Sequence, residues 1–97
     1  MKFRSKKLLD YARDIPDCTG CGTPNVGQVV MAHSNWSEHG KGMGTKAHDW
    51  AVAALCDECH RQVDSGLWPK REKRQYWDRA HIRTLTWLVA TGRLRVP

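Results

Sequence analysis

The spacing of apolar positions divides the first part of the chain into a helix and a strand. Apolar residues recur at helical spacing between Ser5, a residue type that commonly caps helix N-termini, and Pro16, which prevents further helix. This pattern predicts a short amphipathic helix over residues 6–13. The next apolar segment, residues 28–33, is rich in β-branched side chains and predicts a strand that ends at His33.

The second part of the chain begins with a loop and becomes helical. Residues 34–47 contain several glycines and neither a helical nor a strand period, so we expect a loop there. The apolar run 50–55 fits a second strand or a buried helical turn, and its periodicity does not decide between them. A helix is predicted over about 56–65, followed by a long helix over about 70–91 that Gly92 is placed to end.

The cysteines occur as two C-x-x-C pairs, and this spacing favours a metal site. Each pair can point two thiolates at one ion, and two pairs make a tetrahedral zinc site. The basic N-terminus is not followed by the apolar region of a secretory signal, and no apolar stretch is long enough to span a bilayer. We therefore expect a reducing cytoplasm, which disfavours disulfides. Because a chain of 97 residues buries only a modest core, zinc is expected to staple the fold, on Cys18, Cys21, Cys56 and Cys59.

The charge balance indicates an anionic partner. Sixteen Lys and Arg against 10 Asp and Glu give a formal charge of +6 and a pI near 9.5, a common property of nucleic-acid-binding domains. Contacts of this kind hold the phosphate backbone and carry little sequence information. The apolar residues 85–90 must be covered by this domain or by a second subunit, so the sequence leaves monomer and homodimer open. The candidate phosphate contacts are Lys41, Lys46, Lys70, Arg71 and Arg74.

Three residues suit the hydrolysis of a phosphodiester bond. That reaction needs a base for water, a cation to stabilise negative charge, and positive groups that hold the backbone. His33 is the candidate base, and Asp49 and His60 are candidate ligands of a divalent ion, since a carboxylate suits hard cations and Mn, Ni, Co or Zn accept imidazole. His60 follows Cys59 on the predicted helix, about 100° around its axis, so the two can serve different ions.

The order CTGC, VVMAHS, a loop and LCDECHRQVD, over residues 18–64, resembles the ββα-metal unit of HNH endonucleases that carry a four-cysteine zinc. The stretch AHDWAVAALCDECHRQVD is similar to the small prophage-encoded YbcO-like HNH family, and the loop GKGMGTKAHD is similar to the HNH domain of the phage recombination nuclease Ref. The resemblance implies a single α+β domain over 1–97, with a ββα-metal core at 18–66 and helical extensions at 4–14 and 70–92.

The resemblance also implies an activity. It implies a hydrolase, a metal-dependent endonuclease that cleaves DNA in phage or prophage recombination or DNA processing. His33 would be the general base, and His60 would bind a catalytic Mg, Mn or Ni ion beside the structural zinc.

Two positions differ from the HNH pattern. Many HNH nucleases carry an Asp ligand where this chain has Ala32, and the central Asn often falls where this chain has Ala51. Asp49 is therefore our candidate for the catalytic ion, with His48 as the alternative. The alternative function is a non-catalytic zinc module that binds nucleic acid. A RING-type or LIM-type interaction module would need further ligand pairs that four cysteines do not provide.

Overall fold

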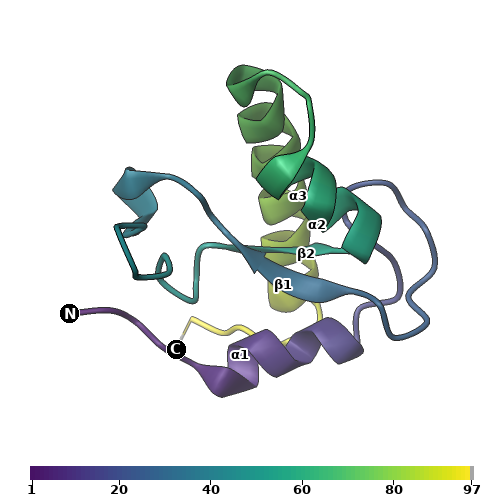
Figure 1. Ribbon diagram of the computed structural model, residues 1–97. Helices are drawn as coiled ribbons and strands as arrows, with labels where there is room; N and C mark the ends of the chain where they lie inside the picture. Colours follow the sequence, from purple (N-terminus) through teal and green to yellow (C-terminus); the bar gives the residue numbers. More distant parts are fainter. Residues whose placement is uncertain (97) are drawn as a thin grey trace.

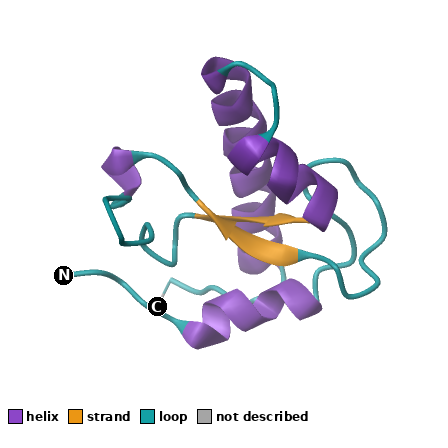
Figure 2. Cartoon of the chain, viewed as in Figure 1, coloured by secondary structure: helices purple, strands orange, loops and turns teal. Residues whose placement is uncertain are grey.

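The computed structural model describes residues 1–96 as a small α+β fold, built on a two-stranded antiparallel sheet and three α-helices (Figure 1). The elements are α1 (Lys6–Asp10), β1 (Val30–His33), β2 (Val52–Leu55), α2 (Asp57–Ser65) and α3 (Lys70–Ala90), with 3₁₀ turns at Tyr11–Arg13 and Ser37–His39. Figure 2 shows that long loops connect these elements around the hairpin. The predicted α+β class, the strand ending at His33 and the long C-terminal helix are confirmed.

The hairpin is the centre of the fold. Val30 pairs with Leu55 and His33 pairs with Val52 at its two ends. The run 50–55, which fitted either a strand or a helical turn, therefore forms a strand. Every side chain of β2 is buried, because α1 lies on one side of the hairpin and α2 and α3 lie on the other (Figure 1). A strand covered on both faces is apolar throughout, so it lacks the alternation that identifies a half-exposed strand.

Helix α3 is joined to the hairpin by side chains that bind main-chain groups of the strands. The indole of Trp77, 1% exposed, donates to the carbonyl of Ala32 at 3.1 Å. The hydroxyl of Thr84 accepts the N–H of Ala54 at 2.9 Å, and His81 donates from Nδ1 to a carbonyl of β2 at 2.6 Å. These contacts satisfy buried polar groups in the core, so His81 has a structural role.

The apolar half of α3 is only partly covered. Leu88 is 3% exposed, whereas Leu85 and Val89 are 42% and 54% exposed. Gly92 ends the helix with φ 75°, and the N–H groups that follow it bond back to the carbonyl of Leu88. In residues 1–96 no helix combines the length and apolar character that a membrane span requires.

Helix α1 begins where the sequence predicts, but it is α-helical only to Asp10 and continues as a 3₁₀ turn. The hydroxyl of Ser5 accepts the N–H of Leu8 at 3.2 Å, which caps the helix. The amide of Asn25 donates to the carbonyls of Ala12 and Ile15, at 3.0 and 2.8 Å. Asn25 thus satisfies carbonyls at the end of this segment, whose last turn, Tyr11–Arg13, is 3₁₀.

Candidate functional site

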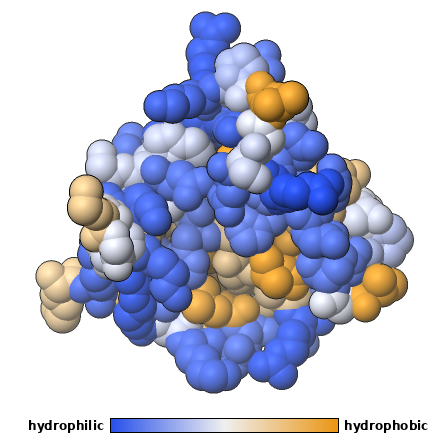
Figure 3. Space-filling view, viewed as in Figure 1, coloured by the Kyte–Doolittle hydropathy of each residue, from blue (hydrophilic) through white to orange (hydrophobic). Residues whose placement is uncertain are grey.

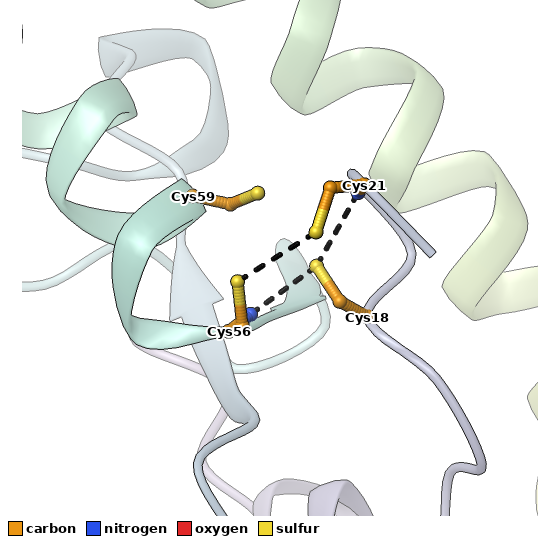
Figure 4. Close-up of side chains that lie close together, drawn as sticks. All are labelled: Cys18, Cys21, Cys56 and Cys59. Atoms are coloured by element: carbon orange, nitrogen blue, oxygen red, sulfur yellow. Dashed lines mark hydrogen bonds between the residues drawn. The ribbon is translucent and has the colours of Figure 1, made fainter. Parts of the chain in front are cut away.

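The four cysteines form one cluster between the loop before β1 and the start of α2. Their sulfurs point toward one another (Figure 4), and all lie within 4.8 Å of each other. The Cys21 and Cys56 sulfurs are 3.9 Å apart. Tetrahedral zinc with bonds of about 2.3 Å places its sulfurs about 3.8 Å apart, whereas a disulfide needs about 2.05 Å. The cluster therefore fits a zinc ion.

Main-chain N–H groups prepare the first cysteine for a metal. Cys18 Sγ accepts the N–H groups of Gly20, Cys21 and Cys56 at 3.3 to 3.5 Å. Burial alone would raise the pKa of the Cys18 thiol, but these N–H groups lower it to about 7. Burial raises the pKa of Cys56 and Cys59. Zinc, which binds thiolates, must therefore displace protons from these two residues.

The turn that carries Cys18 and Cys21 packs directly on the hairpin and α3. A Cβ atom on Gly20 would lie 2.8 Å from the ring of Tyr76, so only glycine fits there. The N–H of Thr19 donates to the carbonyl of Ala54 at 2.9 Å, and Arg83 donates to the carbonyl of Thr19 at 2.9 Å. The cysteine cluster thus holds together a loop, a strand and two helices.

A second site lies at the end of β1, where His33 contacts Asp49. His33 Nε2 is 2.8 Å from Asp49 Oδ1, and Asp49 is 2% exposed. Because an ionised carboxylate only accepts, Nε2 carries the proton and Nδ1 is the basic nitrogen. Nδ1 has no hydrogen-bond partner within residues 1–96. Burial alone would raise the pKa of Asp49, but His33, the Ser5 N–H and the Arg4 charge hold it below its usual value.

The N-terminal segment holds Asp49 in place. Arg4 Nη1 lies 3.1 Å from Asp49 Oδ1, and the Ser5 N–H donates to Oδ2 at 2.7 Å. The N–H of Asp49 donates in turn to the carbonyl of Phe3 at 2.9 Å. The sequence did not indicate this role for Arg4, because one more cation in a basic N-terminus gives no signal of a partner 45 residues away.

Replacement of Arg4 by methionine is expected to destabilise the fold by roughly 1–2 kcal/mol, since a buried carboxylate loses one of its donors. Urea unfolding of the zinc-loaded protein measures this change. Arg13→Met is the matched control: Arg13 pairs with Asp10 at the surface, 3.3 Å away, and should cost at most about 0.5 kcal/mol. Equal losses in the two variants would contradict the role of Arg4.

His60 lies on α2 in a different cluster. His60 Nε2 is 2.9 Å from Asp64 Oδ2, one helical turn further on. The amide of Asn35, which follows β1, donates to Asp64 Oδ1 at 2.9 Å. Neither Asn35 nor Asp64 was predicted from the sequence. His60 and Asp64 are four residues apart on a helix that begins at the second cysteine pair. This i, i+4 spacing is the sequence signal that could have identified Asp64 as the partner of His60.

The predicted ion ligands, Asp49 and His60, each have another side chain as partner. Within residues 1–96, the four cysteines are the group of three or more metal-ligating side chains that lie close enough to hold an ion. Asp49 is engaged by His33 and by the N-terminal segment, and His60 is engaged by Asp64. The alternative residue, His48, accepts the N–H of Phe3 at 2.9 Å and stacks on Trp50.

Most of the predicted phosphate contacts are exposed cations. Arg74 differs, because it pairs with Glu38 and Asp78 at 3.0 and 3.1 Å and lies over the ring of Trp36. Arg74 is thus held by its own domain. No carboxylate in residues 1–96 lies within 4 Å of the charged nitrogens of the others, which are Lys41, Lys46, Lys70 and Arg71.

Comparison with known proteins does not assign this arrangement. No family model, curated protein or solved structure matches the chain. The chemistry must therefore follow from the residues themselves. They offer a thiol cluster for zinc, an imidazole held by a buried carboxylate, and an imidazole beside an exposed carboxylate.

Proposed function

We propose that this chain is a metal-dependent nuclease of the HNH type that hydrolyses phosphodiester bonds in DNA. The observation that carries the proposal is His33 at the end of β1, held through Nε2 by the buried Asp49. A carboxylate fixes the orientation and tautomer of such an imidazole, which makes it suited to take a proton from water. The order β1, β2, α2, joined to a four-cysteine cluster, is also the order that the HNH resemblance implies.

In this proposal His33 and Asp49 act as a pair. His33 accepts a proton from water at Nδ1, and the water attacks the phosphorus. Asp49 keeps the Nε2 proton in place and stabilises the charge that forms on the ring. Arg4 and the Ser5 N–H position Asp49, so we assign this carboxylate to holding His33 rather than to an ion.

The catalytic ion is proposed to bind at His60 and Asp64. An imidazole nitrogen and a carboxylate oxygen 2.9 Å apart form a donor set that Mn or Ni accepts readily and Mg less readily. The bound cation supplies charge stabilisation for the phosphorane and the departing 3′ oxygen. Asn35 orients Asp64 and follows His33 by two residues, so the Cα atoms of Asn35 and His33 are at most about 7 Å apart. The proposed mechanism requires the two clusters to act on one phosphate.

Plasmid cleavage across a titration of Mg, Mn and Ni tests the proposal. His60→Ala and Asp64→Asn are expected to raise the metal concentration needed for half-maximal cleavage by roughly tenfold or more, because each removes a ligand. Asp57→Asn is the matched control, since Asp57 is an exposed carboxylate on the same helix without a histidine partner. A control variant that shifts as far as Asp64→Asn would contradict the ion site.

The unpaired cations in the loop and on α3 favour a second candidate, a zinc module that binds nucleic acid without cleaving it. The same assay separates the two functions. A wild-type protein that binds DNA but does not cleave it with any divalent ion would support the binding module and contradict the nuclease.

A further inference from the structure

A cleft of about 330 Å³ lies where the chain leaves β1 and where α2 ends and α3 begins. Its volume is at the lower end of the roughly 300–1,000 Å³ of pockets that take small ligands. Figure 3 shows mostly hydrophilic side chains at the upper end of the molecule, where α3 begins, with a hydrophobic group beside them. The lining residues are Asn35, Trp36, Val63, Asp64, Lys70 and Lys73.

The charges of the cleft are arranged for an anion. Within residues 1–96, neither Lys70 nor Lys73 has a carboxylate within 4 Å of its ammonium group, whereas the neighbouring Arg74 has two. Asp64 is the acidic residue of the lining; it already accepts a hydrogen bond from Asn35, and its Oδ2 lies 2.9 Å from His60 Nε2. Two free ammonium groups over a concave surface favour a bound negative charge.

The other part of the lining is apolar. Val63 is 3% exposed, and the ring of Trp36 packs at 5.6 Å from the ring of Trp77. The guanidinium of Arg74 covers the Trp36 ring at 4.7 Å, which fixes its orientation. A site that combines an apolar wall with two cations suits a ligand with an apolar part and a negative part.

We infer that this cleft binds one sugar-phosphate unit of a DNA strand. Lys70 and Lys73 hold the phosphate, and Trp36 packs against the sugar. The identity of the strand as DNA rests on the proposed function. Because Asp64 belongs both to this cleft and to the proposed ion site, a strand bound here passes next to the reacting phosphate.

The inference predicts that charge in the cleft matters more than charge elsewhere. The test variant is Lys70→Gln with Lys73→Gln. The matched control is Lys6→Gln with Lys7→Gln on α1, which removes the same total charge from an exposed helix. Binding of a fluorescent DNA oligonucleotide to zinc-loaded protein without other divalent ions is measured by anisotropy over a series of salt concentrations.

The cleft variant is expected to lose at least about tenfold in affinity and to reduce the slope of log affinity against log salt by about 1, because the contact to one phosphate is removed. The control should lose less than about threefold. Unchanged thermal transitions and zinc content show that both variants fold. Equal losses of affinity in the two variants would overturn the inference.

A competition experiment tests the sugar part of the ligand. An abasic oligonucleotide should displace the labelled strand from wild type at concentrations within about threefold of those of the intact strand, while inorganic phosphate should compete far more weakly. Equal competition by inorganic phosphate would reduce the cleft to a simple anion site and overturn the inference.

The binding experiment on the cleft and the cleavage experiment on the nuclease can fail independently of each other. Loss of binding in the cleft variant, with a wild type that never cleaves, would contradict the nuclease and support the cleft. A wild type that cleaves, with a cleft variant that binds and cleaves equally well, would contradict the cleft alone.

Discussion

Removal of zinc is expected to unfold the chain. A structural zinc site contributes roughly 10–16 kcal/mol of apparent binding free energy, and domains of this kind have a net stability of only about 5–15 kcal/mol. The cysteine cluster joins the loop before β1 to α2, and the same loop bonds to β2 and α3 through Thr19. Loss of the ion would separate these elements. The far-UV circular dichroism of the protein during a chelator titration measures the effect.

Cys21→Ala should have the same effect without a chelator, because three thiolates leave the ion with an incomplete ligand set. Chelator saturated with zinc beforehand is the control and should leave the spectrum unchanged. A reducing agent must be present throughout, so that disulfides do not replace the metal. A sharp and unshifted thermal transition in zinc-free protein would contradict the structural role of zinc.

The elements of the fold that depend on local spacing were predictable. The cysteine pairs, the cap at Ser5 and the stop at Gly92 are each specified within a few residues, and the structure contains all three. Strand β2 was ambiguous because its apolar run has no period, and its strand structure comes from pairing with β1 while α3 packs over it. The 3₁₀ turn after α1 was not predicted, and the amide of Asn25 binds the carbonyl of Ala12 in that turn and that of Ile15 after it.

The candidate site was predictable only in part, because its partners are distant in sequence. His33 follows from its place at the end of an apolar run. The sequence could not show that Arg4 and the Ser5 N–H bind the carboxylate oxygens of Asp49. Nor could it show that Asp64 is the partner of His60. Lys73 resembles any other lysine on a charged helix until the fold places it in a cleft. The contacts of a site thus depend on topology, while its residue types are visible in the sequence.

Replacement of His33 by alanine is expected to lower the rate of DNA cleavage by roughly 10²–10⁴-fold, the usual contribution of a general base. Zinc content, the thermal transition and DNA affinity should stay close to those of wild type, because His33 belongs neither to the cysteine cluster nor to the proposed DNA cleft. Single-turnover plasmid nicking at saturating metal measures the rate, beside an anisotropy assay of binding.

Two further measurements separate a base from a residue that only supports the fold. Added imidazole should restore part of the activity of His33→Ala, since a free base can enter the space that the ring leaves. Asp49→Asn should also slow cleavage, yet the double variant should be little slower than His33→Ala alone, because residues that act as a unit are not additive. If the losses of cleavage rate in the two single variants add up in the double variant, Asp49 acts independently of His33, for example as a ligand of an ion. If His33→Ala cleaves as fast as wild type, another residue is the base and the central assignment of the proposed mechanism fails.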